Sequence, residues 1–369
     1  MRIIFTVTND LNYDQRMQRI CSTIASNGFD VLLVGRKLRS SLPFLPKTFA
    51  AKRLRCFFNS GFLFYFEYNL RLFFFLLFQK CDGICAIDLD TILPVYFVSA
   101  LRRKERIYDA HELFTEQKEI VSRKNVQRIW LAIERFAVPK FENGYTVNLF
   151  IRDELKRRYG VKYGIVRNLP LLGYDTFSSV HDQAFIIYQG AVNEGRSFET
   201  LIPAMKDSPI PLHIYGRGNF FKQAKDLIAL HQLEEKVKLF GYVEPSVLKT
   251  ITPAATIAVT LFERTGLNQY YSLSNRFFDY IMAGVPQICV NYPEYKAIND
   301  VHNIALMIDD TDESTIKDAV LKLLQNETLY NTLRENCMKA RKVLNWQEEE
   351  KKLVSFYRSL FNSNDGLNG

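Results

Sequence analysis

Two glycine-bearing turns in the second half of this 369-residue chain have the composition of a phosphate site. Tyr188-Gln189-Gly190 closes an expected strand, and Gly195-Arg196 precedes a helix expected over 197–204. Glycine lets a ligand approach the backbone closely, a helix N-terminus offers free N–H groups, and Arg196 could add a bidentate contact. Tyr215-Gly216-Arg217-Gly218 repeats the pattern after the next expected strand. Neighbouring parallel strands would bring both turns to one crevice, although such glycines also serve ordinary turns.

Residues 270–286 contain a third candidate phosphate contact. Ser274 is a typical helix N-cap residue, which places Arg276 in the first helical turn. A cation is unfavourable at that end of a helix, and a bound anion would offset the conflict. Asp279 lies three residues further on and therefore on the same helix face. The alternative interpretation is an ordinary Arg–Asp pair on the surface of the helix.

Short apolar runs that alternate with amphipathic stretches are expected to position these residues. The pattern is typical of parallel, doubly wound sheets, and it restarts halfway along the chain, which predicts two Rossmann-like units in tandem. We expect the join near Arg167-Asn168-Leu169-Pro170, because proline restricts the residue before it. Expected strands cover 3–7, 31–34, 84–87, 107–108 and 144–147, then 185–188, 212–215, 237–240, 257–260 and 286–290; expected helices include 14–27, 220–231 and 275–283.

Composition and charge narrow the class of protein. The sequence is 47% hydrophobic and 24% charged, which is typical of a globular protein and excludes disorder or coiled coil as the main state. Of the net charge of +8, residues 1–170 carry 28 Lys/Arg against 16 Asp/Glu, whereas residues 171–369 carry 20 against 24. A basic first half can attract anionic lipid, phosphorylated substrates or nucleic acid, or can simply be a solvated surface.

The cysteines and the N-terminus favour a cytoplasmic protein. The six cysteines are too few and too scattered for a disulfide scaffold, so we expect reduced thiols. No His or Cys pair completes a zinc site with Cys81 and Cys85. The first ten residues turn polar too soon for a signal peptide and predict a buried first strand instead.

The aromatic segment 57–78 allows two interpretations. It contains the run Phe73-Phe74-Phe75-Leu76-Leu77-Phe78. Glu67, Asn69 and Arg71 interrupt it, so it is not the apolar stretch of about 20 residues that a spanning helix needs. We favour a core or interdomain helix. The alternative is a helix that docks on a membrane surface beside the basic residues.

Several motifs occur along the chain in the order found in one enzyme family. In the second half these are Gly190 with Arg196, the Tyr-Gly-x-Gly turn at 215–218, Phe240-Gly241-Tyr242-Val243, and the run 272–286. In the first half they are the loop 10–16 and Tyr108-Asp109-Ala110-His111-Glu112, and near the end Asn345-Trp346 with the helix that follows. Over nearly its whole length the sequence therefore resembles family 4 of the retaining glycosyltransferases, whose fold is GT-B. The run 272–286 is the most specific part of the resemblance.

The resemblance implies an α/β protein of GT-B fold, with two Rossmann-like, doubly wound domains facing a cleft. The acceptor domain would cover 1–169, completed by a C-terminal helix at about 346–362, and the donor domain would cover 170–345. The implied reaction moves a sugar from a nucleotide-diphosphate sugar to a hydroxyl group with retention of configuration, without metal or cofactor. We expect a glycan or lipid-linked acceptor in surface polysaccharide or glycolipid synthesis. The expected location is the cytoplasm, with possible peripheral contact with the inner face of the cell membrane through the basic first half.

The resemblance also implies roles for individual residues. Arg196 and Arg276 would hold the diphosphate, and His111 would reach the transferred sugar. Asp14 and Arg16 would face the acceptor. The remaining donor-pocket residues would be Gly190, Gly216, Tyr242, Val243, Ser274, Asn275 and Asp279. Outside this motif, His111 would be interpreted as a buried, hydrogen-bonded structural histidine.

Some features depart from the family or suggest other functions. Tyr271 stands where family members commonly carry Glu, and Arg replaces the usual Lys at 196 and 276. The absence of Glu at position 271 leaves a non-catalytic sugar-nucleotide-binding protein as an alternative function, and a nucleotide-sugar epimerase is a second alternative. Asp88-Leu89-Asp90 resembles a metal-binding D-x-D motif, but two carboxylates alone make a poor Mg²⁺ site. Nucleic acid is not an expected partner, because the sequence has no recognisable nucleic-acid-binding module.

Overall fold

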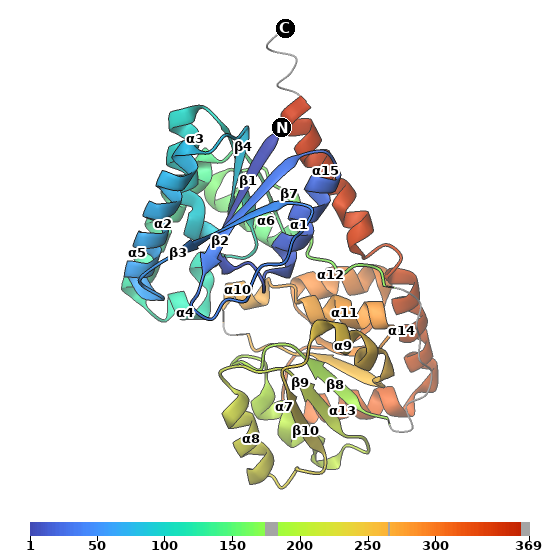
Figure 1. The fold of residues 1–369 in the computed structure, drawn as a ribbon. Helices are drawn as coiled ribbons and strands as arrows, with labels where there is room; N and C mark the ends of the chain where they lie inside the picture. The colour runs from blue at the N-terminus through green and yellow to red at the C-terminus, as the bar shows by residue number, and fades with distance from the viewer. Residues whose placement is uncertain (174–183, 265, 363–369) are drawn as a thin grey trace. The chain divides into compact units, whose positions relative to one another are not determined.

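The computed structural model describes residues 1–173, 184–264 and 266–362. It divides the chain into two compact units (Figure 1). Unit 1 comprises Met1–Asn168 and Glu348–Gly369, and unit 2 comprises Leu169–Gln347. The C-terminal segment therefore belongs to the unit that contains the N-terminus.

Unit 1 is built on a parallel sheet. Among the described residues this sheet has seven strands in the order β3-β2-β1-β4-β5-β6-β7. Phe5 of β1 pairs with Leu33 of β2 on one side and with Cys85 of β4 on the other. The order reverses direction between β1 and β4, and such a switch point is where open α/β sheets bind ligands. The strands are β1 (Arg2–Asp10), β2 (Asp30–Lys37), β3 (Ala50–Arg55), β4 (Gly83–Ile87), β5 (Glu105–Ala110), β6 (Asn143–Thr146) and β7 (Gly164–Ile165).

Helices connect these strands and cover the sheet. Helix α1 is amphipathic and begins where Asp14 caps it by accepting a hydrogen bond from the Met17 N–H. The C-terminal helix α15 buries Tyr357 against Phe5 and Tyr145, which are themselves core residues of the sheet. The helices of this unit are α1 (Gln15–Ser26), α2 (Gly61–Phe78), α3 (Ile92–Arg102), α4 (Lys118–Val121), α5 (Lys124–Ala137), α6 (Leu149–Tyr159) and α15 (Trp346–Asn362), the last from Glu348 onward.

Unit 2 repeats the architecture. Its sheet has, within the described part of the chain, six parallel strands in the order β10-β9-β8-β11-β12-β13, with a switch point between β8 and β11. The strands are β8 (Ile186–Gln189), β9 (Leu212–Tyr215), β10 (Val237–Gly241), β11 (Ile257–Thr260), β12 (Gln287–Val290) and β13 (Ala305–Ile308). The helices are α7 (Phe198–Ala204), α8 (Phe221–Leu230), α9 (Pro245–Ile251), α10 (Leu267–Tyr270), α11 (Asn275–Ala283), α12 (Pro293–His302), α13 (Glu313–Gln325) and α14 (Glu327–Ala340).

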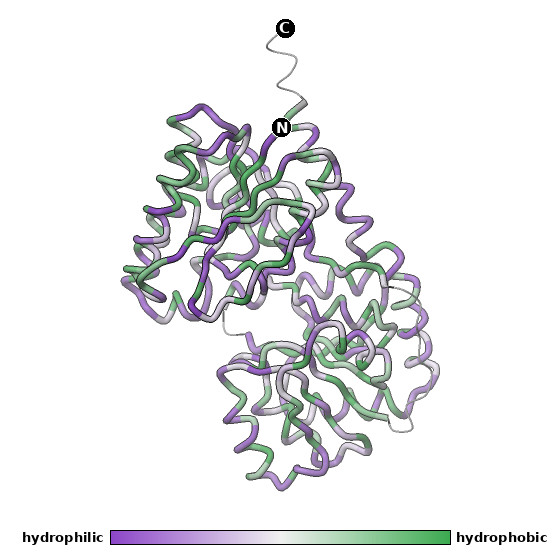
Figure 2. The backbone as a smooth tube through the Cα atoms, in the orientation of Figure 1, coloured by the Kyte–Doolittle hydropathy of each residue, from purple (hydrophilic) through white to green (hydrophobic). Residues whose placement is uncertain are grey.

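The two predicted doubly wound units are confirmed, and hydrophobic segments run through the middle of each sheet (Figure 2). Helix α11 has the predicted bounds. Three strands were not predicted. Strand β3 has a basic sequence and is largely exposed, because it lies at the edge of its sheet. Strand β7 is only two residues long, and strand β13 is a short apolar run. Within the segment 57–78, the helix begins only at Gly61, after Phe57 and Phe58.

Candidate functional site

The turns after β8 and β9 meet at the carboxyl edge of the unit 2 sheet. Gly190 has φ 120° and Gly216 has φ 149°, conformations that side chains rarely adopt. A Cβ atom on Gly216 would lie 1.7 Å from the Gly190 carbonyl oxygen. The Gly190 N–H donates to the Tyr215 carbonyl at 2.9 Å. Gly216 is therefore required by the close approach of the two turns and Gly190 by its backbone conformation, which leaves a stretch of backbone without side chains at this edge.

Arg276 lies beside these turns, in the first turn of α11. Its guanidinium carbon lies 4.3 Å from the centre of the Tyr188 ring, and the ideal Cβ position of Gly190 is 3.9 Å away from it. Arg276 is buried, and in the described part of the chain no hydrogen-bond acceptor reaches its Nη1 atom. Burying a cation without a counter-charge is costly, so the arrangement favours an anionic ligand at this point.

The Ser274 side chain bonds to Arg276 instead of capping the N-terminus of the helix. Ser274 is the N-cap residue of α11, as predicted, but its side chain makes no cap hydrogen bond. Its Oγ accepts a hydrogen bond from Arg276 Nε at 3.1 Å. The Ser274 N–H donates to the Tyr295 hydroxyl at 2.9 Å. The positive end of the α11 dipole and the Arg276 cation thus lie together, and an anion would interact favourably with both.

Arg196 shares an aromatic neighbour with Arg276. The guanidinium carbon of Arg196 lies 4.3 Å from the centre of the Phe262 ring, and that of Arg276 lies 5.0 Å from the same centre. Arg196 follows Gly195, with φ 78°, and precedes Ser197, with φ 57°, so a sharp turn positions it before α7. The structure thus brings together the two arginines that the sequence suggested for a diphosphate.

The other predicted donor residues lie around this edge of unit 2. Asp279 accepts a hydrogen bond from Gln189 Nε2 at 3.0 Å, which links α11 to the end of β8. Asn275 opens α11 and is exposed. Tyr242 and Val243 follow the end of β10; Tyr242 is exposed, whereas Val243 packs partly against a small apolar cluster. Asn275, Tyr242 and Val243 lie at the α11 N-terminus or after the carboxyl end of a strand, where α/β sheets bind ligands, and Asp279 lies in the middle of α11.

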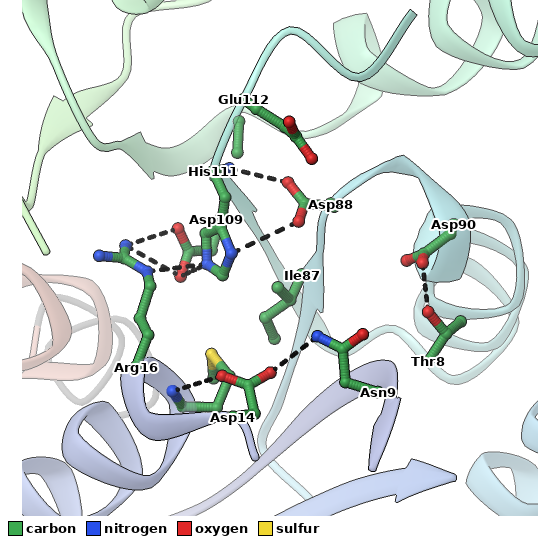
Figure 3. Close-up of polar contacts among 12 residues, drawn as sticks. Thr8, Asn9, Asp14, Arg16, Ile87, Asp88, Asp90, Asp109, His111 and Glu112 are labelled. Carbon is green, nitrogen blue, oxygen red and sulfur yellow. Dashed lines mark hydrogen bonds and ion pairs between the residues drawn. The ribbon is translucent and has the colours of Figure 1, made fainter. Parts of the chain in front are cut away.

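Unit 1 has its own polar cluster at the carboxyl ends of β1, β4 and β5 (Figure 3). His111 Nε2 lies 3.0 Å from Asp109 Oδ2, and its Nδ1 lies 3.4 Å from Asp88 Oδ2. Arg16 Nη2 lies 3.0 Å from Asp109 Oδ1. Asp109 is fully buried, whereas the side chains of His111 and Asp88 keep 20% and 18% of their exposure. A substrate can therefore reach His111 and Asp88 but not Asp109.

These contacts set the charge states of the cluster. Burial alone would lower the pKa of His111, but the Asp109 carboxylate above all, with a smaller contribution from Asp88, outweighs burial and raises that pKa to about 9. Burial raises the pKa of Asp109, but Arg16 and His111 together lower it by more. The pKa of Asp109 is therefore below its ordinary value. Burial raises the pKa of Asp88 to about 8. At neutral pH, His111 is thus a cation supported by the buried Asp109 carboxylate.

Sequence reasoning treated Asp88 only as part of a D-x-D motif and missed its place beside His111. Asp88 has φ 54° and ψ −179°, a region that residues other than glycine rarely occupy. In this conformation its Oδ1 accepts a hydrogen bond from the His111 N–H at 2.8 Å. Strain of this kind is concentrated at functional sites. An aspartate directly after a strand that ends at the switch point was the signal that could have identified it.

Asp14, Arg16 and Asp90 have partners within unit 1. Asp14 caps α1, and its Oδ2 accepts a hydrogen bond from Asn9 Nδ2 at 3.0 Å. Arg16 is a buried partner of Asp109 and His111 rather than a side chain that faces solvent. Asp90 bonds to Thr8, away from Asp88 (Figure 3). Within residues 1–173, 184–264 and 266–362, no group of three or more His, Cys, Asp or Glu side chains is arranged to hold a metal ion.

Two Rossmann-like units, each with polar groups at its switch point, define the architecture of the GT-B glycosyltransferases, and the solved structures that resemble the chain have this fold. Sucrose-phosphate synthase from Thermosynechococcus elongatus has a TM-score of 0.77 at 16% identity and covers 98% of this chain and 100% of its own. HepE from Anabaena, solved in complex with UDP, has a TM-score of 0.75 at 12% identity, with 97% and 100% covered. WaaG, a glycosyltransferase involved in lipopolysaccharide biosynthesis, has a TM-score of 0.74 at 14% identity, with 95% and 98% covered.

The family match lies within unit 2. Residues 176–340 match the family described as glycosyl transferases group 1. Probable sucrose-phosphate synthase 2 from Oryza sativa subsp. japonica is 31% identical over 104 residues, which are 28% of this chain. The matched stretch spans only 10% of the length of the rice protein. The comparisons thus show that the chain shares the fold of these solved structures and that its residues 176–340 match the group 1 glycosyl transferase family.

Proposed function

We propose that this protein is a retaining, metal-independent glycosyltransferase that moves a sugar from a nucleotide-diphosphate sugar to a hydroxyl group of a lipid-linked glycan. The observation that carries the proposal is Arg276, a buried guanidinium beside bare glycine backbone and a helix N-terminus, with Arg196 across the Phe262 ring. Two cations beside glycine backbone and a helix N-terminus at one sheet edge suit a diphosphate. A monophosphate or a carboxylate would need fewer of them.

The leaving group explains why these cations matter for rate. Negative charge builds on the nucleoside diphosphate as the bond to the sugar breaks. Arg276, Arg196 and the α11 N-terminus would stabilise that charge more in the transition state than in the ground state, which is the condition for catalysis. The proposed metal independence rests on this supply of positive charge by the protein.

His111 is assigned to the transferred sugar. Because its pKa lies at about 9, it is protonated at neutral pH and would act as a hydrogen-bond donor rather than as a general base. Asp109 and Arg16 are positioning residues in this proposal, since they fix the imidazole without reaching solvent. Asp14 is assigned to the acceptor in this proposal. Asp88 is a further accessible carboxyl group beside His111.

Two comparisons support the donor and acceptor classes. HepE was solved in complex with UDP, which favours a uridine nucleotide as the first donor to test. WaaG takes part in lipopolysaccharide biosynthesis, which favours a lipid-linked glycan as acceptor and surface polysaccharide or glycolipid synthesis as the process. Both proteins share only the fold with this chain, so donor and acceptor remain proposals for it.

Incubation with UDP-, GDP- and ADP-linked sugars, with and without a membrane lipid extract and with EDTA present, tests the proposal. We expect sugar transfer to a lipid-extractable product, released nucleoside diphosphate in equal amount, and the same anomeric configuration in donor and product. Arg276→Ala should abolish transfer, whereas Arg334→Ala, on the exposed face of α14, should not. An epimerised free donor, or binding without turnover, would contradict the transferase assignment.

A further inference from the structure

Helix α2 is apolar on two opposite faces. Its inner face buries Phe64, Tyr68, Leu72 and Leu76, spaced four residues apart, in the core of unit 1. Its outer face carries Phe62, Phe66, Leu70, Phe74 and Phe78, also four residues apart, and each of these is exposed. Spacing of four places each set along one side of a helix. A soluble helix ordinarily carries polar residues on its outer side, so the outer face of α2 requires a separate explanation.

The two neighbouring helices, α3 and α5, also carry exposed aromatic side chains. Tyr65 of α2 packs edge-on against Trp130 of α5, with ring centres 5.2 Å apart. Phe97 of α3 and Phe136 of α5 are both exposed, with ring centres 6.3 Å apart. Figure 1 shows α2, α3 and α5 close together in unit 1. We define the apolar face as the outer stripe of α2 together with Phe97 and Phe136. Exposed apolar side chains gathered on neighbouring helices in this way mark a candidate interaction site.

Cations adjoin the apolar face. Residues 61–78, 92–106 and 118–140, which include the three helices, carry eleven Lys and Arg against four Asp and Glu. Arg128 and Arg135 are exposed on α5, seven residues apart, and each directly precedes an exposed apolar residue, Ile129 and Phe136. Lys140 Nζ lies 4.2 Å from the centre of the Phe136 ring. Aromatic and aliphatic side chains flanked by Lys and Arg are the composition that binds the surface of an anionic bilayer.

The helix does not need to cross a membrane to use this surface. Within the described residues, α2 is long and apolar enough to span a bilayer by length and composition alone. However, its inner face packs on the core of unit 1, and Glu67 accepts hydrogen bonds from the Phe57 and Phe58 N–H groups. A spanning state would have to break all of these contacts and carry Glu67 and Arg71 into the hydrocarbon region.

We propose that the apolar face docks unit 1 on an anionic lipid bilayer, with the aromatic side chains in the interface and the flanking cations on lipid headgroups. The favourable free energy would come from apolar burial and from attraction of the cations to negative lipids. Only the outer side chains would change environment, because the inner face of α2 stays in the core. The inference does not depend on the proposed transferase activity, since it concerns a different surface and binding without turnover.

Flotation of the full chain with phosphatidylcholine vesicles, with and without phosphatidylglycerol, tests the docking face. We expect binding to the anionic vesicles that weakens with salt, and binding at least about tenfold weaker for the double variant Phe66→Ser/Phe74→Ser. The control is Leu230→Ser/Val301→Ser, which removes two even more exposed apolar residues from unit 2 and should leave binding unchanged. Circular dichroism and a thermal melt would verify that each variant is folded.

The contribution of charge to vesicle binding is tested separately with the double variant Arg128→Glu/Arg135→Glu. Its control is Lys322→Glu/Lys339→Glu, which changes a pair of exposed cations on α13 and α14. The first pair should weaken binding to anionic vesicles, and the second should not. Equal binding of wild type and Phe66→Ser/Phe74→Ser, or no binding to either vesicle, would overturn the proposal. A stable dimer in vesicle-free sedimentation that Phe66→Ser/Phe74→Ser dissolves would also overturn it and would assign the face to a second copy of the chain.

Discussion

At the scale of single residues, the most informative side chain is Arg276. Its unfavourable place in the first turn of a helix was visible in the sequence, and this conflict predicted an anion. The structure adds two contacts that the sequence does not reveal: the Arg276 Nε donates a hydrogen bond to Ser274 Oγ, which does not cap the helix backbone, and the Arg276 guanidinium packs on Tyr188 of strand β8. Contacts between residues about ninety positions apart depend on the sheet order and not on local pattern.

Two substitutions of Arg276 should distinguish the effect of its charge on sugar transfer from the effect of its bidentate geometry. Arg276→Ala removes the guanidinium and should reduce sugar transfer on the order of 100-fold or more, by comparison with the loss of other charge-stabilising donors. Arg276→Lys keeps a charge but loses the bidentate geometry, so its rate should fall less. Steady-state assays with the accepted donor would measure both, with Arg334→Ala as the exposed control. Near-normal turnover of folded Arg276→Ala would refute the phosphate role.

His111 should make stability depend on alkaline pH. Its pKa is raised from 6.5 to about 9 in the folded protein, so its stabilising contribution is complete below about pH 6.5 and is lost as pH rises through about 9. The raised pKa of Asp88 acts in the same direction over a lower range, from its ordinary value of 3.8 up to about 8, because folding disfavours its ionisation. The free energy of unfolding should therefore fall between about pH 6.5 and 9, by on the order of 1–3 kcal/mol.

Urea unfolding at several pH values would test this dependence. His111→Gln removes the titrating imidazole, so its unfolding free energy should change less over that pH range than that of the wild type. His302, near the end of α12, provides the matched control, since His302→Gln leaves the unit 1 cluster intact. A wild-type curve that rises with pH through this range would contradict the assigned charge states.

At the scale of elements, strands and helices with strong periodicity could be predicted, and α11 was predicted with its bounds. Strand β3 could not, because an edge strand exposes its side chains and therefore lacks the apolar alternation that identifies a strand. The outer face of α2 was ambiguous for a related reason: an apolar helix gives the same sequence pattern whether its second face meets protein, lipid or water. Only the packing distinguishes its inner residues from Phe66 and Phe74.

The turn after β9 is the element on which the proposed phosphate site depends most. Gly216→Ala adds a Cβ that would meet the Gly190 carbonyl oxygen at 1.7 Å, at a φ of 149°. We expect unfolding of unit 2 to become easier by more than about 1 kcal/mol, and nucleotide affinity to fall, because the two turns must separate. Gly173→Ala is the control, since an added Cβ there meets no atom within 4 Å. Calorimetry with and without nucleotide would measure both effects.

At the scale of the whole molecule, unit 1 is assembled from two distant segments of the chain, whereas unit 2 is one continuous segment. The tandem of two doubly wound sheets followed from the alternation of strands and helices, which is a property of the chain as a whole. The return of the C-terminal segment to unit 1 was expected only through the resemblance to a family, because periodicity does not indicate where a helix packs. In the structure, Glu349 of α15 accepts a hydrogen bond from the Arg167 N–H at 2.8 Å, which joins the two chain segments of unit 1.

The C-terminal helix should therefore control the stability of unit 1 in particular. Tyr357→Ala removes a fully buried ring that packs against Phe5 and Tyr145, and the cost should be about 3–5 kcal/mol, as for other large-to-small aromatic substitutions in cores. Ser355→Ala, at an exposed position of the same helix, should change little. Nucleotide binding by unit 2 should persist in both variants, and calorimetry with titration of nucleotide would distinguish the two units.

The central claim is that unit 2 holds a nucleoside diphosphate on Arg276 and Arg196, and ligand-induced thermal stabilisation tests it most directly. The measurement compares UDP, GDP, ADP and CMP, without metal, on wild type, Arg276→Ala, Arg196→Ala and Arg334→Ala. We predict selective stabilisation of the wild type and of Arg334→Ala by one diphosphate, by about 2.7 kcal/mol at 100 times its dissociation constant, and a loss of the effect in the other two variants. No stabilisation by any of these nucleotides, or an undiminished effect in Arg276→Ala and Arg196→Ala, would contradict the claim.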